Sequence, residues 1–173
     1  PLFSNSAYLN ILRIAGLNLN TQLLVTYFQF NKNSYLNKLD LSHNKLNYLP
    51  NDIFKENLYL SVLNLSFNFL KHFSESILYT INRYYKHRII LNNNQICLYE
   101  YEKVDKKYNY YRILINLSRN NLTQFDFEYL YLFQNLADLD LSFNLIKNVS
   151  PVKKIIKNEI RYLIYLICIF VII

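Results

Sequence analysis

The stretch LNKLDLSHNKLNYLPNDIF, from Leu36 to Phe54, decides the fold of this chain. If Leu36 is counted as position 1, leucines follow at positions 4, 6 and 11, and Asn44 stands at position 9. Positions 4 and 6 lie two residues apart, so their side chains point to the same face of a short strand. The amide of Asn44 can satisfy backbone groups that a sharp bend after the strand leaves unpaired. The stretch therefore predicts a strand with one buried face, followed by a bend built on Asn44.

The same frame recurs along the chain, with intervals of 24, 26, 26 and 24 residues between its asparagines. The position-9 asparagines are Asn44, Asn68, Asn94, Asn120 and Asn144. Position 1 of the six copies is Leu9, Leu36, Leu60, Lys86, Arg112 and Leu136. The first copy is degenerate, because Leu17 stands where the asparagine should be. Amphipathic helices do not explain an asparagine held in register at such a period, so the pattern predicts a repeat solenoid.

Each copy is expected to contribute one strand to a single curved parallel sheet. The strands should centre near Ile11–Arg13, Lys38–Asp40, Val62–Asn64, Arg88–Ile90, Leu114–Asn116 and Asp138–Asp140. Positions 4 and 6 should then face a continuous core, and positions 2, 3, 5, 7 and 8 should face outward. The position-9 asparagines should be buried at the bends as a ladder.

These motifs resemble the leucine-rich repeat superfamily, and the resemblance covers nearly the whole chain. The 24-residue spacing and the Leu-Pro-x-x-Ile-Phe tail of residues 49–54 are similar to the "typical" extracellular subfamily. That subfamily includes Toll-like receptors and small matrix proteoglycans. The resemblance implies an α/β solenoid: a horseshoe with a concave parallel sheet and an irregular or short-helical convex side. It also implies protein recognition by the concave face rather than catalysis.

One solenoid domain of about six repeats is expected over residues 1–159, because nothing in the composition marks a linker. Leu2 and Phe3 stand where Ile53 and Phe54 stand in the best copy, before the opening leucine of the next. The chain therefore opens on the tail of a preceding repeat, and we expect it to be a fragment.

The last residues, 160–173, read IRYLIYLICIFVII and have three interpretations. They fit a degenerate seventh repeat, because Ile160 lies 24 residues after Leu136. They also fit the start of a transmembrane helix, although the apolar run is shorter than the roughly 20 residues that a span requires. The third interpretation is translation of non-coding sequence.

The charge of the chain, formally +7, does not indicate nucleic-acid binding. The lysines cluster in 147–161 and alternate with acidic residues in 100–107, and no basic stripe or nucleic-acid motif accompanies them. The three histidines occupy unrelated repeat positions, and the single glycine excludes a glycine-rich phosphate loop. Asp138 and Asp140 are read as solvated surface acids rather than as an acid–base pair. We therefore expect no enzyme activity, no cofactor and no metal site.

The compartment is read mainly from four N-x-Ser/Thr sequons, which are glycosylation candidates. They are Asn64, Asn116, Asn121 and Asn148. The sequons favour an extracellular or cell-surface glycoprotein with a receptor or adhesion role. The alternative is a cytoplasmic repeat scaffold or regulatory subunit with a membrane anchor in its last residues. The two cysteines, Cys97 and Cys168, do not distinguish these alternatives.

A protein partner is expected on the concave face, which should be about 25–30 Å long because six strands lie about 4.8 Å apart. That length suits a protein loop or helix better than a small metabolite. The candidates combine charged and aromatic side chains, as interface hot spots do. The candidate residues are Asp40, His43, Phe67, Arg88, Arg119, Asp140 and Phe143. Phe67 and Phe143 are either such hot spots or residues partly covered by their neighbours.

Overall fold

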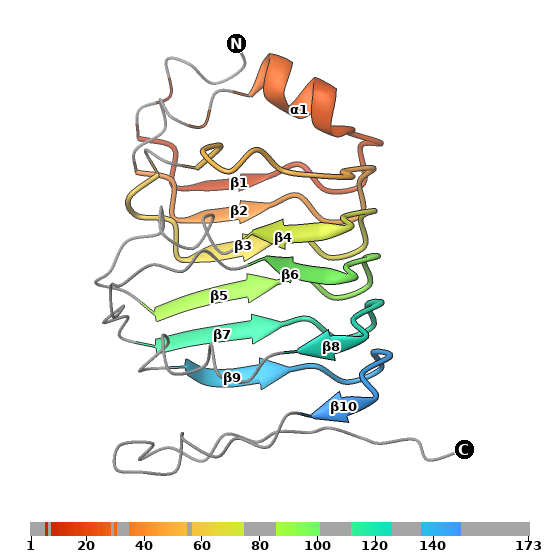
Figure 1. Ribbon diagram of the computed structural model, residues 1–173. Coiled ribbons are helices and arrows are strands. Elements are labelled where there is room, and N and C mark those ends of the chain that lie inside the picture. The colour runs from red at the N-terminus through yellow and green to blue at the C-terminus, as the bar shows by residue number, and fades with distance from the viewer. Residues whose placement is uncertain are drawn as a thin grey trace.

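The computed structural model describes residues 6, 8–28, 30, 35–54, 57–74, 86–100, 112–125 and 136–149. Its main element is a six-stranded parallel sheet in the order β1-β2-β3-β5-β7-β9 (Figure 1). The strands are β1 Ile11–Arg13, β2 Lys38–Asp40, β3 Val62–Asn64, β5 Lys86–Ile90, β7 Arg112–Asn116 and β9 Leu136–Asp140. All six predicted strands are confirmed, so each copy of the motif forms one turn of a solenoid.

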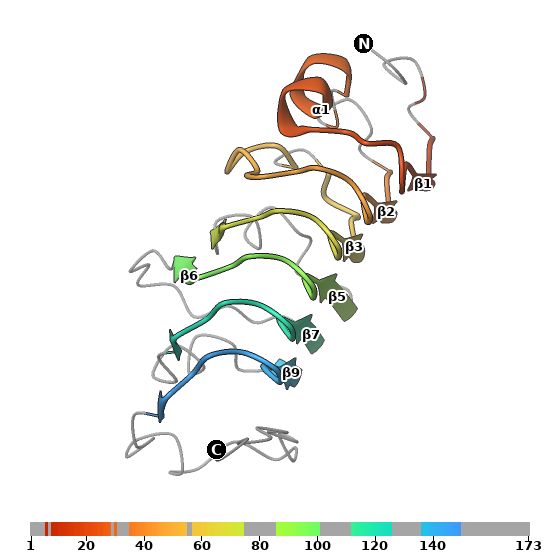
Figure 2. The same ribbon diagram turned by 90° about the vertical axis from the view of Figure 1, so that its right-hand side faces the viewer.

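The opposite side of the solenoid carries shorter elements (Figure 2). They are α1 Thr21–Tyr27, β4 His72–Ser74, β6 Leu98–Glu100, β8 Gln124–Phe125 and β10 Asn148–Val149. β4 pairs with β6 and β8 with β10, both in parallel. The helix is capped by Asn20, whose side chain accepts a hydrogen bond from the Leu23 backbone N–H at 2.8 Å. One face is therefore a continuous sheet, as expected, and the other carries the short helix α1 and several short strands, whereas the resemblance implied an irregular or short-helical side.

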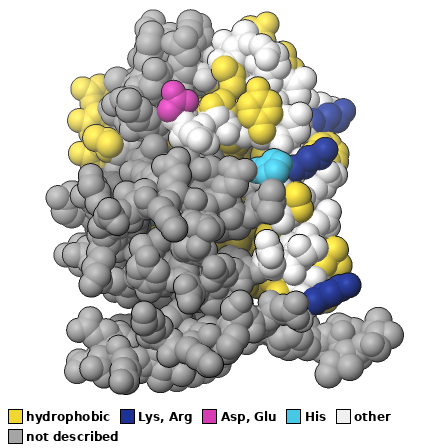
Figure 3. All heavy atoms as spheres, in the orientation of Figure 1, with side chains coloured by type: hydrophobic (Ala, Val, Ile, Leu, Met, Phe, Trp, Pro, Cys, Tyr) yellow, Lys and Arg dark blue, Asp and Glu magenta, His cyan; other side chains and the backbone are white. Residues whose placement is uncertain are grey.

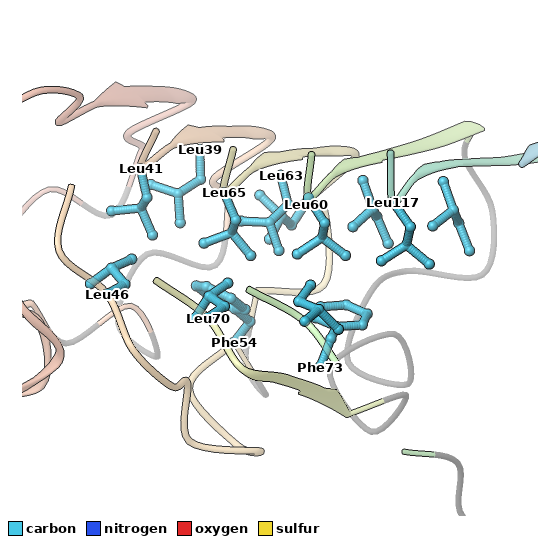
Figure 4. Packing of buried hydrophobic residues seen from close by; sticks show 14 of the residues in the cluster. Leu39, Leu41, Leu46, Phe54, Leu60, Leu63, Leu65, Leu70, Phe73 and Leu117 are labelled. Atoms are coloured by element: carbon cyan, nitrogen blue, oxygen red, sulfur yellow. The ribbon is translucent and has the colours of Figure 1, made fainter. Parts of the chain in front are cut away.

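The core is one column of apolar side chains between these two sides. Leucines from positions 4 and 6 of the strands, such as Leu63 and Leu65, are fully buried. They face a second row from the convex side, which includes Leu70 and Phe73 (Figure 4). Because each repeat contributes the same slots, the column runs through every described repeat without a break.

The asparagine ladder is confirmed in its contacts. The Asn68 side chain accepts from the Leu46 N–H of the previous repeat at 3.0 Å. Its Nδ2 donates to the carbonyls of Leu41 in the previous repeat and Leu65 in its own, at 3.0 and 3.1 Å. Asn94 and Asn120 repeat this pattern with their own neighbours. Each buried amide therefore joins two successive turns where the backbone bends.

The ladder differs from expectation at its last described rung. Asn44, Asn68, Asn94 and Asn120 are buried, but Asn144 is only half-buried. Asn144 follows β9, the edge strand of the sheet, so within the described residues no further turn covers it. Its hydrogen bonds to the Leu122 N–H and the Leu117 carbonyl are nevertheless formed, at 3.0 and 2.9 Å.

The assignment of position 1 to Lys86 and Arg112 was wrong. The column is filled one residue later, by the buried side chains of His87 and Ile113. Ile113 pairs with Leu136, and the register then shifts before Leu114 meets Asp138. The β5 and β7 repeats thus lack the extra residue that the β2, β3 and β9 repeats place before position 3.

The extra residue forms a β-bulge, which is seen in the backbone hydrogen bonds at the start of β3. The Ser61 and Val62 N–H groups both donate to the Asn37 carbonyl, at 2.8 and 3.1 Å. In β5 the Arg88 N–H bonds to the Ser61 carbonyl at 2.8 Å. A bulge sets two residues of one strand against one residue of its neighbour. In a repeat without a bulge, the buried residue before the strand is therefore one residue closer in sequence to the buried residues of the strand.

Candidate protein-binding site

The left-handed backbone of position 8, just after each strand, is the most unusual feature of the exposed surface. The first repeat has glycine there, Gly16, with φ of 71°. The other five repeats have non-glycine residues with φ between 54° and 56°. We call this set the position-8 row: Gly16, His43, Phe67, Asn93, Arg119 and Phe143. Each N–H of the first five donates to the position-7 carbonyl of the next repeat, so the conformation is required by the solenoid.

Side chains other than glycine and asparagine are strained in this conformation, by roughly 1–2 kcal/mol per residue. The row offsets part of that strain by contacts between neighbours. The His43 and Phe67 rings stack with centroids 4.2 Å apart and planes 10° apart. The Arg119 guanidinium lies over the Phe143 ring, 4.4 Å from its centroid. Such contacts give about 0.5–1.5 kcal/mol each, less than the combined strain of the two residues that form one.

The row remains open to solvent despite these contacts. Phe67 is 45% exposed and Phe143 is 58% exposed, while His43 and Arg119 are also exposed. The two phenylalanines are thus stacked against neighbours on one side and accessible elsewhere. Strained backbone that carries large exposed side chains points to a role outside folding.

The other sequence candidates lie on the strands beside this row. Arg88 is exposed at position 3 of β5, opposite Val62 on one side and Leu114 on the other. Asp40 and Asp140 are half-buried at position 5, and each accepts a backbone hydrogen bond at 3.0 Å from the serine two residues later. The two carboxylates therefore also hold the turn, a part that the sequence reasoning did not assign to them.

Position 7 was expected to face outward, and that expectation was wrong in three repeats, whereas Ala15 at this position is exposed and Asn92 and Ser142 are half-buried. Ser42, Ser66 and Ser118 are buried. Their N–H groups donate to position-5 side chains, and in two repeats the hydroxyl does so as well. The small serine side chain turns back onto the strand, so the outward surface at the turn is left to position 8.

The sequon asparagines fall into two structural settings. Asn64 and Asn116 are half-buried, and each Oδ1 accepts bonds from the N–H and the hydroxyl of its own sequon serine. Asn121 is exposed, as is Thr123 two residues later. The Asn148 side chain and residues 160–173 lie outside the described residues.

Two exposed features were missed by the sequence reasoning. Position 10, two residues beyond position 8, carries Phe69 and Leu145, which are 47% and 57% exposed. The residue before position 1 is tyrosine in three successive repeats, and Tyr8, Tyr35 and Tyr59 stack with centroids 5.6 and 5.5 Å apart. The signal for both was an aromatic or apolar residue at a fixed offset from the leucine frame.

The described residues hold no group of three or more His, Cys, Asp or Glu side chains placed to bind a metal ion. Over the same ranges no helix combines the length and apolarity of a membrane span. Cys97 is a half-buried free thiol whose Sγ lies 3.6 Å from the Lys71 carbonyl oxygen. The chemistry that the surface offers is stacking, charge and amide hydrogen bonding.

The fold is that of leucine-rich repeat domains. The chain is similar to a structure described as the crystal structure of the leucine-rich repeat domain of APL1B, with a TM-score of 0.62 and 22% identity. The likeness covers 87% of this chain and 40% of the other, so this chain spans about two fifths of the APL1B chain. A structure described as the APL1 leucine-rich repeat domain matches with a TM-score of 0.46, 17% identity, and coverage of 86% and 53%. No family model and no curated protein matches the sequence.

Proposed function

We propose that this chain recognises a protein partner through its sheet face and the position-8 row at the edge of that face. The observation that carries the proposal is the strained row itself, in which His43, Phe67, Arg119 and Phe143 hold large exposed side chains where glycine or asparagine would fit without strain. The fold supports binding to proteins in general, because stacked repeats present adjacent side chains along an extended surface. Binding rather than catalysis is the role we assign.

The partner surface includes the strand residues beside the row. Arg88 adds an exposed cation near the middle of the sheet, and Asp40 and Asp140 add carboxylates on β2 and β9. Because the six strands are adjacent and in register, one partner can contact several of these side chains at once. Many modest contacts of this kind add up to specific binding.

The experiment that tests this proposal probes an array of proteins from the same source with the intact chain. Every binder is then titrated against Phe67→Asn, Phe143→Asn and Arg88→Glu. We expect each change to weaken binding about tenfold or more, the effect of removing an interface anchor. The matched control is Leu58→Asn, which removes an apolar side chain 53% exposed and remote in the repeat from position 8. Equal loss in the control, or no loss in the three site variants, contradicts the proposal.

We further propose an extracellular or cell-surface setting as part of a receptor or adhesion protein, with a cytoplasmic scaffold as the alternative. The support is the set of sequons, of which Asn121 with Thr123 is exposed. Expression through a secretory pathway should attach a glycan at Asn121, seen as a mass shift that Asn121→Gln removes. An unmodified secreted chain contradicts the setting.

A further inference from the structure

We propose that the partner is an acidic, extended peptide segment that places two large apolar side chains, four residues apart, on the turn edge. By the turn edge we mean positions 8 and 10 of successive repeats. This inference rests on the proposed function and assigns the kind of partner that the same site takes. It follows from where the apolar, polar and basic residues fall along that edge.

Two apolar patches mark the ends of the site. The first is Phe67 with Phe69 after β3, and the second is Phe143 with Leu145 after β9. All four side chains are between 45% and 58% exposed. β3 and β9 are separated by two strands, so the patches lie three strand spacings apart, about 14 Å.

That separation favours an extended segment over a helix. Residues four apart in an extended chain point to the same side and are about 13–14 Å apart. On a helix, residues that share a face recur at seven, eight or eleven positions, about 10, 12 or 16 Å apart at a rise of about 1.5 Å per residue. None of these spacings matches the separation of the patches as closely as four residues of an extended chain do.

The residues between the patches also suit an extended chain. Asn93 and Gln95, after β5, carry side-chain amides, the first half-buried and the second exposed. An extended segment leaves its backbone N–H and C=O groups unpaired, whereas a helix satisfies most of its own. The two amides offer both donors and acceptors to such a backbone.

The charge of the edge selects an acidic segment. In all six repeats, positions 6–14 contain no Asp or Glu at all. They do contain four exposed basic residues: Lys45 and Arg119 on the turn edge itself, and Lys71 and Lys147 two residues beyond position 10. The nearest carboxylates, those of Asp40 and Asp140 at position 5, are half-buried on the strands. Figure 3 shows dark-blue basic and yellow hydrophobic side chains gathered along the right-hand side, where the strands of Figure 1 end. Complementary charge on a partner raises its association rate and excludes basic competitors.

The backbone of the edge is already fixed before a partner arrives. The N–H of Phe67 donates to the Asn92 carbonyl at 3.0 Å, and that of Phe69 donates to the Leu46 carbonyl at 2.8 Å. The N–H of Leu145 is bonded in the same way to the Leu122 carbonyl at 2.8 Å. A rigid edge loses little conformational freedom on binding, which favours recognition of a flexible segment.

The test is selection of random linear peptides displayed on phage against the intact chain. The peptides that bind are then titrated against edge and sheet-face variants. The edge variants are Phe67→Asn, Phe69→Asn and Phe143→Asn, the sheet-face variant is Arg88→Glu, and the control is Leu58→Asn. Asparagine replaces Phe67 and Phe143 because Asn93 holds the same backbone conformation in this chain. The Phe69 variant tests a residue of the turn edge that lies outside the position-8 row. Thermal melting confirms that each variant is folded.

We expect the selected peptides to be acidic, with two large apolar residues four apart. Their binding should fall about tenfold or more in each edge variant and remain unchanged in the control. Selected peptides that are basic, that show another spacing, or that ignore the edge variants overturn the inference, and so does a selection that enriches nothing. If a folded partner still loses binding with Arg88→Glu, the proposed function stands without this inference. If every binder is insensitive to both kinds of variant, both are overturned.

Discussion

At the scale of the residue, each turn depends on two neighbours with opposite roles. Position 9 carries a buried amide that bonds two repeats, as Asn68 does with Leu41 and Leu65. Position 8 carries an exposed side chain on strained backbone, as Phe67 does. The first residue serves the fold. The second costs stability and faces solvent, so the two should respond to substitution in different ways.

Asn68→Ala should destabilise the protein by about 1–3 kcal/mol or more, because it leaves the buried Leu46 N–H without its acceptor. It also removes one of the two asparagine donors to each of the Leu41 and Leu65 carbonyls. Urea denaturation of parent and variant measures the change in the free energy of unfolding. If the two curves coincide, the account of the ladder is wrong.

Phe143→Asn should leave the free energy of unfolding within about 1 kcal/mol of the parent. The change relieves left-handed strain of roughly 1–2 kcal/mol and loses a cation–π contact of about 0.5–1 kcal/mol. The same denaturation experiment measures it, with Asn93 as the native example of asparagine at this position. A loss above about 2 kcal/mol would show that the Phe143 side chain serves folding.

Residue type and spacing alone predicted the ladder, since a side-chain amide has two donors and an acceptor for the backbone groups of a buried bend. They did not predict that Ser42 is buried, because a small polar side chain can face either way at the end of a strand. The exposure of Phe67 was one of two readings of the sequence, and the left-handed backbone that exposes it is set by bonds between repeats.

At the scale of the element, each strand was placed correctly by its alternating leucines, but its neighbour sets its register. The sequence placed Lys86 at the position of the opening leucine, but the buried side chain there is that of His87, because a fixed count back from Asn94 takes no account of a bulge that some repeats have and others lack. A bulge is decided by pairing with the adjacent strand, and one sequence does not show that pairing. Pairing with the adjacent strand therefore decides the register, which the local sequence pattern does not determine.

Leu65→Ala and Leu117→Ala should each destabilise the protein by about 2–5 kcal/mol, since both side chains are fully buried in the column. The spread within that range depends on how far neighbouring repeats can close the cavity. Thermal or urea denaturation gives the values, and a loss below about 1 kcal/mol at both sites would contradict a continuous packed column.

The tyrosine stack offers an internally controlled prediction. Tyr35 stacks on both Tyr8 and Tyr59, whereas Tyr8 stacks on Tyr35. At about 0.5–1.5 kcal/mol for each aromatic pair, Tyr35→Ala should cost about twice what Tyr8→Ala costs. Denaturation of the two variants side by side measures the ratio, and equal losses would show that the stack contributes nothing.

At the scale of the whole molecule, stacking of the repeats places equivalent side chains side by side on an extended surface. Contacts run between successive repeats, so the sheet face and the turn edge present the same positions of every repeat at a fixed spacing. The sequence predicted the architecture because the repeat period is a global signal. It predicted the strands of the sheet face but missed the exposed side chains of Phe69 and Leu145, whose backbone N–H groups bond back to the previous repeat.

The central claim is that the position-8 row serves recognition and not folding. The most direct measurement is a titration of a bound partner against the double variant Phe67→Asn, Phe143→Asn at a temperature where parent and variant are equally folded. We predict a loss of affinity of about a hundredfold, as two separated anchors of about tenfold each should combine. Unchanged affinity, or a loss matched by Leu58→Asn, would contradict the claim.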